Sequence, residues 1–385
     1  MLSLIILMFC CTGSMGAILP FLQVVLRNMG CSLSIIGLVG SLSDVCSILL
    51  PLLIARLADK AGRSKGSLAG SVIAYMALFA PALLSSSIWV SVVCIALATG
   101  FSSAVLPMSD SMATGYLKGN SMGYGIVRSF GSAGYIVVCL LLGFTGWPDT
   151  SDNKSILLCI LLSGAITLLS LFFFPQGYEG RSQTKPVKLS QISSILTKPF
   201  LALMAITAIQ RFSWTFVDKF SALYLKEELG YGDYYLVLVA LGPLLEIVFM
   251  LLGGKLLDKG RIHGSSLLLV GCLGIFARYM LYYFCHDSLT GILLAQLMHG
   301  ISYGAFQMGA LKLIATSIEK EHYSLAIGIF YSIGQRIPIV LGSMVGGFII
   351  ESSGYSSSLL FFAAFGLASA LLTVFLTRTL NSKAS

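Results

Sequence analysis

Long apolar stretches alternate with short polar connections along the whole chain. The stretches are continuous and show no alternation of apolar and polar residues, so they predict transmembrane helices and argue against barrel strands. A helix needs roughly 20 apolar residues to cross the hydrocarbon layer. We therefore expect about twelve spans, near residues 2–26, 33–57, 67–85, 88–116, 124–146, 155–174, 199–224, 235–257, 265–285, 289–316, 323–350 and 357–377.

Two short charged islands interrupt this pattern at related positions. Residues 55–65 read A-R-L-A-D-K-A-G-R-S-K, and residues 254–261 read G-K-L-L-D-K-G-R. The aspartates of the two islands lie 199 residues apart, just over half of the 385-residue chain. This repeat predicts an N-terminal six-helix bundle at 1–174 and a C-terminal six-helix bundle at 199–385. The polar, basic residues 175–198 would form a central cytoplasmic loop between them.

The composition agrees with a chain embedded in a lipid bilayer. Apolar residues make up 56% of it and charged residues 10%, with a mean hydropathy of +0.90, whereas about a quarter of soluble-domain residues are charged. The net charge of +8 includes no basic cluster with interleaved aromatic residues, so no nucleic-acid partner is expected. The nine cysteines contain no C-x-x-C pair. We interpret them as packing residues and expect neither a metal site nor a cofactor.

The distribution of basic residues predicts how the spans are oriented. Fifteen Lys and Arg residues lie in connections on one side of the expected spans, and three lie on the other side. Because cytoplasmic loops carry the excess of Lys and Arg, both termini are expected in the cytoplasm, in a multi-pass protein of the inner cell membrane. The first stretch has no basic leader and no small-residue cleavage site, so we expect it to remain as a span.

The first island resembles the signature loop of the major facilitator superfamily, G-x-L-A-D-R-x-G-R-R. Ala55 takes the first Gly position, Lys60 stands for Arg, and Ser64 replaces the last Arg. An aspartate near a helix end can pair with a cation of the other half, and the glycine permits a turn with positive φ. We expect the two loops to be conformational latches, with the residues Asp59, Lys60, Gly62, Arg63, Asp258, Lys259 and Arg261.

A second set of motifs resembles the phenylpropionate-permease branch of the same superfamily. The most specific is Y-G-x-x-R-x-x-G-S-x-G-Y at 124–135, accompanied by P-x-x-D at 107–110 and Q-x-x-H-G-x-x-Y-G at 296–304. That branch is similar to proton-coupled nucleoside and oligosaccharide symporters. The resemblance implies an all-α membrane protein with twelve transmembrane helices in two pseudo-symmetric six-helix bundles. It also implies proton-coupled uptake of a small organic solute.

Ionisable residues inside the expected spans are the candidates for function, because a charge near the bilayer centre costs at least about 2.5–3.5 kcal/mol. Asp110 and Arg128 lie at matching depth near the cytoplasmic ends of consecutive spans. We expect them to form an ion pair that closes the cytoplasmic side and opens during transport. The alternative is a static pair that aids insertion or folding.

Glu246 is the first candidate for the proton carrier, because it lies mid-span, where a desolvated carboxyl group can bind and release a proton. Alternatively, it forms a permanent salt bridge with Arg211 or Arg336. Asp44, in the middle of the second expected span, is the competing proton-coupling residue.

Polar and aromatic residues of the second half form the expected substrate site. Arg336 can bind a substrate carboxylate through two hydrogen bonds, or it can neutralise Glu246. Tyrosine and tryptophan in spans are also typical of packing and of the membrane interface. His299 can titrate during coupling or donate to a neighbouring span. The expected substrate-binding residues are Arg211, Trp214, His299, Tyr303, Gln307, Gln335 and Arg336.

Together these features predict a secondary transporter that takes up a small solute, with the proton as coupling ion. Superfamily antiporters carry a G-x-x-x-G-P element in the fifth span. Its proline is absent here, which favours symport over a proton-coupled exporter of a small organic or drug-like compound. A non-transporting receptor is a further alternative.

The sequence contains no Walker motif, H-E-x-x-H or G-x-S-x-G, so neither an ATP-driven pump nor an enzyme is expected. The predicted partners are the lipid bilayer and a small molecule, either an aromatic acid, a sugar or a nucleoside. The chain is expected to work as a monomer.

Overall fold

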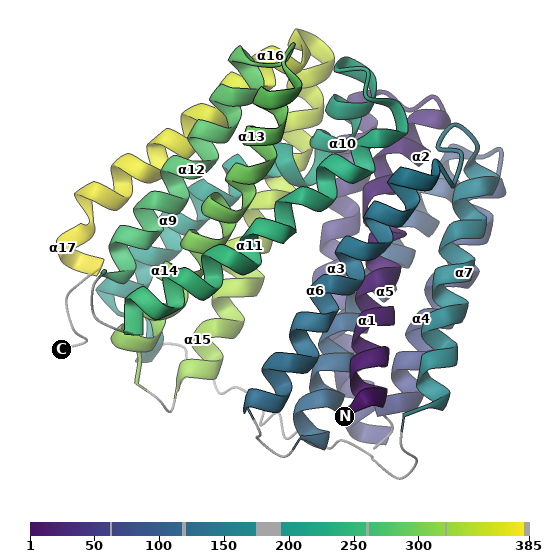
Figure 1. The fold of residues 1–385 in the computed structure, drawn as a ribbon, viewed down its shortest axis with the longest axis horizontal. Helices are drawn as coiled ribbons and strands as arrows, with labels where there is room; N and C mark the ends of the chain where they lie inside the picture. The colour runs from purple at the N-terminus through teal and green to yellow at the C-terminus, as the bar shows by residue number, and fades with distance from the viewer. Residues whose placement is uncertain (62–63, 118–120, 175–193, 259–261, 320–321, 381–385) are drawn as a thin grey trace. The chain divides into compact units, whose positions relative to one another are not determined.

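The computed structural model describes residues 1–61, 64–117, 121–174, 194–258, 262–319 and 322–380, and every regular element in them is a helix (Figure 1). The earlier helices are α1 (Leu2–Gly16), η1 (Leu19–Phe21), α2 (Leu22–Asn28), α3 (Leu33–Ala61), α4 (Ser64–Leu84), α5 (Ile88–Tyr116), α6 (Ser121–Thr145) and α7 (Asn153–Phe172). The later helices are α9 (Lys198–Thr215), η2 (Phe216–Phe220), α10 (Ser221–Leu223), η3 (Tyr224–Glu228), η4 (Gly232–Tyr234), α11 (Tyr235–Asp258), α12 (Gly264–Phe284), α13 (Leu289–His299), η5 (Gly300–Ala305), α14 (Phe306–Ser317), α15 (Tyr323–Ile329), η7 (Phe330–Arg336), α16 (Ile337–Phe375) and α17 (Thr377–Leu380). Most of the expected central loop, residues 175–193, lies outside the described residues.

The described helices agree with twelve crossings. Ten segments are long and apolar enough to cross a membrane. The last of them, Leu325–Phe375, has 51 residues and contains Gly354 with φ 79°, where the chain turns between two spans. α11 has 24 residues, enough for a further span. With α11 added and the last segment divided at Gly354, the structure has the crossings that the sequence predicts.

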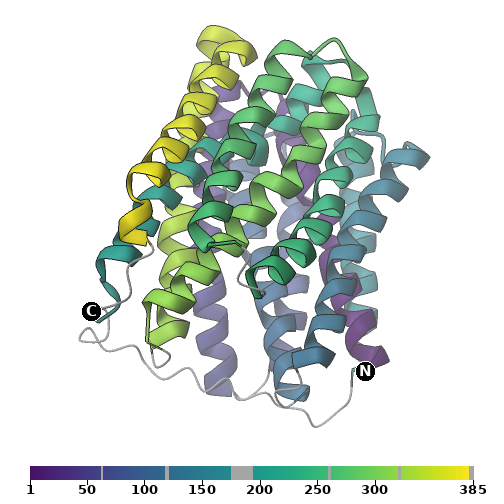
Figure 2. The same ribbon diagram turned by 60° about the vertical axis from the view of Figure 1, so that its left-hand side comes forward.

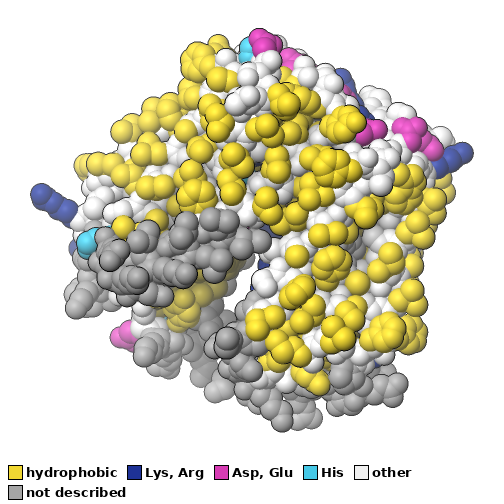
Figure 3. All heavy atoms as spheres, viewed as in Figure 1, with side chains coloured by type: hydrophobic (Ala, Val, Ile, Leu, Met, Phe, Trp, Pro, Cys, Tyr) yellow, Lys and Arg dark blue, Asp and Glu magenta, His cyan; other side chains and the backbone are white. Residues whose placement is uncertain are grey.

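Apolar side chains cover the outside of the helices, as contact with lipid requires. Trp89, Phe172 and Phe375 are 75%, 80% and 82% exposed. Hydrophobic side chains also occupy much of the described surface in Figure 3. Soluble monomers rarely expose apolar patches of this extent. The chain is therefore an integral, multi-pass membrane protein.

The chain forms two compact units. The first unit contains Met1–Thr184 and Leu225–Ala240, and the second unit contains Lys185–Tyr224 and Leu241–Ser385. The division expected from the sequence placed all of 199–385 in one bundle. The structure instead packs residues 225–240, the end of one span and the start of α11, with the first unit.

Residues 225–240 form hydrogen bonds with the rest of the first unit through buried and partly buried polar groups. The Tyr235 hydroxyl donates to the Pro20 carbonyl oxygen at 3.1 Å. The Thr150 hydroxyl donates to a carboxylate oxygen of Asp233. Because buried polar groups are costly unless they are hydrogen-bonded, these contacts fix where the segment packs.

α6 and the start of α11 approach closely at Gly143. A Cβ atom there would lie 2.7 Å from Val237 Cγ2 and 3.1 Å from Leu236 Cβ. Gly143→Leu is therefore expected to lower the free energy of unfolding by about 1–3 kcal/mol through overpacking. Thermal melting of the purified protein would measure the loss. The control is Gly70→Leu, where a Cβ atom meets nothing within 4 Å, and equal melting temperatures of the two variants would contradict this packing.

α1 and α6 pack tightly because glycines of α6 face the backbone of α1. A Cβ atom at Gly134 would collide with the Phe9 carbonyl oxygen, and one at Gly131 would lie 3.0 Å from Met8 Cγ. The Thr12 hydroxyl donates to the Gly131 carbonyl oxygen at 2.5 Å. Small residues permit such an approach between membrane helices. Gly131 and Gly134 of the motif at 124–135 thus have a packing role.

The core of the second unit lies where α9, α12, α14 and α16 meet. α16 packs against α9 and α12, and α12 also packs against α14; Figure 2 shows these helices from a second direction. A Cβ atom at Gly271 would lie 2.6 Å from the backbone nitrogen of Phe306, so α12 and α14 pack backbone to backbone. Large buried side chains fill the core, among them Phe200, Leu203, Ile206, Leu268, Phe306 and Phe330.

Candidate functional site

Three spans of the second unit leave the α-helical path where the predicted substrate-binding residues lie. The segments η2, η5 and η7 are π-helical turns. Trp214 lies two residues before η2, Tyr303 lies in η5, and Gln335 lies in η7. π-helical turns are rare and occur frequently at functional sites. The π-helical turns therefore lie in the same region as the predicted substrate-binding residues.

Glycine brings η5 against the middle of α11. A Cβ atom at Gly300 would lie 2.6 Å from the Leu245 carbonyl carbon and 2.8 Å from the Glu246 backbone nitrogen. No larger residue fits this approach without displacing backbone. The contact places His299, the residue before Gly300, beside the Glu246 side chain.

Arg211 is buried among aromatic rings. The residue is 2% exposed. Its guanidinium carbon lies 4.9, 5.5 and 5.3 Å from the ring centroids of Tyr303, Trp214 and Phe306, respectively. Arg211 Nη2 donates weakly to Gln307 Oε1 at 3.5 Å. Cation–π contacts of this kind offset part of the cost of burying a charge. The described residues include no ion-pair partner of Arg211, so the salt bridge of Glu246 with Arg211, one of the alternatives for Glu246, is not formed; Glu246 lies beside His299 instead.

Arg278 of α12 is a second buried arginine at this site. It is 2% exposed, and its Nη2 donates to Gln296 Oε1 at 2.8 Å and to the Tyr282 hydroxyl at 3.3 Å. Neither Arg278 nor Gln296 was among the predicted site residues. The available signal was an arginine within the apolar stretch G-I-F-A-R-Y-M, but spacing along the chain did not connect it to the other candidates.

His299 connects Glu246 to Arg278. His299 Nε2 lies 3.8 Å from Glu246 Oε2, and His299 Nδ1 lies 3.0 Å from Arg278 Nη1. A guanidinium group only donates hydrogen bonds, so Nδ1 must accept and Nε2 carries the hydrogen of the neutral ring. His299 also lies against Trp214, with 5.1 Å between ring centroids. The imidazole is thus a neutral bridge from a carboxyl group to a buried cation.

Glutamine side chains form a second polar set on the neighbouring helices. Gln307 Nε2 donates to the Tyr331 hydroxyl at 2.6 Å, and Gln335 Nε2 donates to Gln307 Oε1 at 3.1 Å. Gln335 is buried, whereas Arg336, the next residue, is exposed. Adjacent predicted site residues thus differ in environment.

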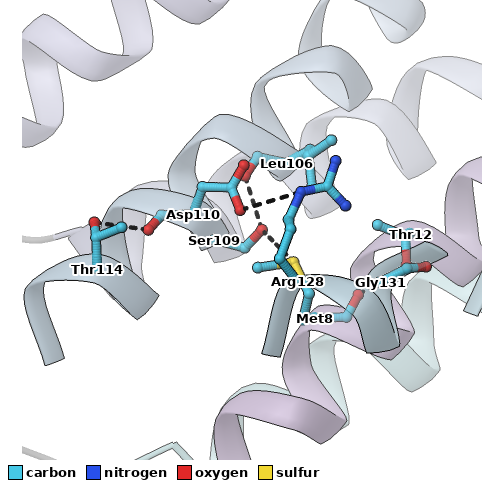
Figure 4. Close-up of polar contacts among 8 residues, drawn as sticks. All are labelled: Met8, Thr12, Leu106, Ser109, Asp110, Thr114, Arg128 and Gly131. Carbon is cyan, nitrogen blue, oxygen red and sulfur yellow. Dashed lines mark hydrogen bonds and ion pairs between the residues drawn. The ribbon is translucent and has the colours of Figure 1, made fainter. Parts of the chain in front are cut away.

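In the first unit, the structure brings Asp110 of α5 and Arg128 of α6 together. Figure 4 shows the two side chains pointing toward one another. Arg128 Nε lies 3.8 Å from Asp110 Oδ1, and the side chains are 39% and 28% exposed. An ion pair at this exposure contributes about 0–1 kcal/mol, so it can separate at little cost.

Asp110→Asn is expected to change thermal stability little and to slow transport. The small stability effect follows from the exposure of the pair, which limits its contribution to about 1 kcal/mol. The slower transport follows if the pair holds one state of the cycle. Thermal melting and solute uptake into proteoliposomes would measure the two effects. Asp287→Asn, which removes an exposed contact of Asp287 with His286, is the control, and unchanged uptake by Asp110→Asn would contradict a gating role.

The remaining candidates lie in the first unit or at helix ends. Asp44 is buried in α3, at 3% exposure. Lys60 is exposed near the end of α3. The other latch candidates lie outside what the structure describes, either wholly or in their side chains: Asp59, Gly62, Arg63, Asp258, Lys259 and Arg261.

Comparison with known proteins identifies relatives of this chain. The model of the MFS_1 like family matches residues 1–377. The chain is 24% identical over 373 residues to the "Uncharacterized transporter YwbF" of Bacillus subtilis, which covers 96% of the chain and 91% of that protein. It is 24% identical over 351 residues to the "Probable 3-phenylpropionic acid transporter" of Escherichia coli, which covers 89% of each.

Among solved structures, a mutant of the nucleoside transporter NupG matches 97% of the chain and 99% of its own chain, with a TM-score of 0.86 and 15% identity. At this identity the match shows the fold alone. The all-α transporter fold predicted from the sequence is confirmed.

Proposed function

We propose that this chain, which belongs to the MFS_1 like family and is a multi-pass membrane transporter, takes up a small organic solute together with protons. The observation that carries the proposal is the connection from Glu246 through His299 to Arg278, which joins α11, α13 and α12. It links one group that can exchange a proton, through the neutral imidazole, to a buried positive charge.

The protonation of Glu246 changes the electrostatics of this connection. The ionised carboxylate attracts the Nε2–H of His299, and the other side of the ring accepts from Arg278. Protonation removes the negative charge, so the ring and the guanidinium lose a partner in a medium where charges interact strongly. A proton can thereby shift the balance between two arrangements of these helices, as alternating access requires.

Other charged groups complete the proposed cycle. Asp44 is the second candidate for proton coupling, and the ion pair of Asp110 and Arg128 is the proposed cytoplasmic gate. The islands at 55–65 and 254–261 are proposed to hold one state. The excess of Lys and Arg in one set of connections supports a cytoplasmic location of both termini.

A proton-flux assay tests the direction of coupling. Purified protein is reconstituted in liposomes that contain a pH-sensitive dye, and 3-phenylpropionate, uridine or maltose is added outside. Symport predicts that a transported solute acidifies the interior, whereas an antiporter would make it alkaline. Protein-free liposomes control for weak acids that cross the bilayer unaided. Entry of a solute without any protein-dependent pH change would contradict proton coupling.

A further inference from the structure

We propose that the transported solute is an organic carboxylate. Its anionic group is recognised by Arg211 and Arg278, and its planar apolar part packs against Trp214 and Tyr303. The inference rests on the proposed function, because it names the substrate class for the site in the second unit.

Two buried cations share one aromatic ring at this site. The guanidinium carbons of Arg211 and Arg278 lie 5.5 and 6.0 Å from the ring centroid of Trp214. Neither arginine has an ion-pair partner among the described residues. The acidic residue one turn beyond Trp214, Asp218, is paired with Lys219 at 3.1 Å. Since cation–π contacts offset only part of the cost of a buried charge, the two arginines favour an anionic ligand.

Among the buried arginines and glutamines of α9, α12 and α13, the polar atoms without a hydrogen-bond partner are mostly donors. In the part of the chain that the structure describes, Nε of Arg211, Nε of Arg278 and Nε2 of Gln296 make no hydrogen bond, and neither amide atom of Gln210 makes one. The Gln296 amide is oriented by Arg278, which donates to its Oε1, so its Nε2 faces away as a donor. These arginines and glutamines therefore have four donor atoms and one acceptor atom without a hydrogen bond.

This imbalance separates a carboxylate from a neutral polyol. An ionised carboxylate only accepts hydrogen bonds, and arginine binds it through charge-assisted bonds. A sugar or nucleoside hydroxyl donates as well as accepts, so it would need acceptors that the set largely lacks. The donor set therefore fits an anion better than the two neutral classes that the sequence leaves open.

Aromatic rings supply the apolar part of the site. The ring centroids of Trp214 and Tyr303 lie 5.6 Å apart. Trp214 is 5% exposed, Tyr303 is half-buried and Tyr331 is 42% exposed, so the set runs from the core of the unit to an accessible edge. Aromatic faces of this kind pack well against a planar group.

Binding to the detergent-purified protein tests the inference without any gradient. The probes are benzoate and 3-phenylpropionate, their neutral amides, phenyl phosphate, uridine and maltose, all at one pH. The readout is quenching of Trp214 fluorescence after Trp89→Phe and Trp147→Phe, which leave it as the one tryptophan of three, together with the shift in melting temperature. We expect a carboxylate to bind at least about tenfold more tightly than its amide, as loss of a charged hydrogen bond implies.

Variants assign the binding to the arginines. Arg278→Gln and Arg211→Gln are each expected to weaken carboxylate binding by about tenfold or more. Arg27→Gln, in the exposed pair with Glu227, should leave binding unchanged. If the buried variants do not fold, the comparison of each carboxylate with its amide in the unsubstituted protein still decides the question.

Three results would overturn the inference. The first is that amides or neutral solutes bind as tightly as the carboxylates. The second is that phenyl phosphate binds more tightly than every carboxylate. The third is that no probe binds. The proposed function fails separately. A carboxylate that binds but drives no proton flux contradicts proton coupling alone, whereas a neutral solute that drives proton flux contradicts the carboxylate alone.

Discussion

Glu246→Gln is expected to abolish uphill solute accumulation driven by a pH gradient while preserving exchange of solute for solute. Glutamine has nearly the size of glutamic acid but cannot ionise, so the site stays in the equivalent of its protonated state. The loaded transporter can still change its access from one side to the other. The step that releases the proton is lost, and net uptake stops with it.

Uptake into proteoliposomes measures both activities. Accumulation is followed with an inward proton gradient, and exchange is followed with equal pH on both sides and unlabelled solute inside. Glu228→Gln is a matched control, because Glu228 is an exposed glutamate at the end of a span. Gradient-driven accumulation by Glu246→Gln at the level of the unsubstituted protein would remove Glu246 from the coupling mechanism.

Asp44→Asn distinguishes the two candidates for proton coupling. If Glu246 alone exchanges the proton, this variant retains accumulation, although the solute concentration for half-maximal uptake can change. Loss of accumulation in Asp44→Asn together with its retention in Glu246→Gln would transfer the coupling role to the first unit.

Gly134→Leu is expected to have the largest effect on folding. A Cβ atom at Gly134 collides with the Phe9 carbonyl oxygen and lies 2.8 Å from Thr12 Oγ1. A backbone atom cannot rotate away as a side chain can, so α6 must move off α1 along its length. The cost is expected at about 3 kcal/mol or more, the upper end of overpacking effects, which is a large part of a typical folding free energy.

Folding of the variant is measured by the yield of monodisperse protein in detergent and by its melting temperature. Gly70→Leu introduces the same side chain on α4 without a neighbour within 4 Å. Equal melting temperatures of the Gly134→Leu and Gly70→Leu proteins would show that the close approach of α1 and α6 does not determine stability.

The limits of the sequence are clearest at the candidate site. Counting residues along ideal helices placed Glu246, Arg211 and Arg336 at similar depth and made them possible partners. Depth does not specify which helices pack together, and here Gly300, the residue after His299, packs against the backbone of Leu245 and Glu246. The structure therefore pairs Glu246 with His299 and leaves Arg211 among aromatic rings.

Arg278 is a second case in which spacing along the chain did not identify the partners of a charged residue. Its charge lies inside an apolar stretch, but its partners Gln296 and His299 lie on the next helix. Their contact depends on how α12 and α13 pack. In contrast, Asp110 and Arg128 lie together as their matching depths on consecutive spans indicated.

The sequence by itself determined the twelve apolar spans, the transporter family and the glycines that let α1 and α6 pack closely. Partition of a segment into lipid depends on its own apolar residues, and a glycine permits close approach through its own lack of a side chain, so both are local properties. Only the tertiary structure decided that His299 bridges Glu246 to Arg278 and that two arginines share Trp214. These contacts depend on the packing and register of separate helices, which no single stretch of sequence specifies.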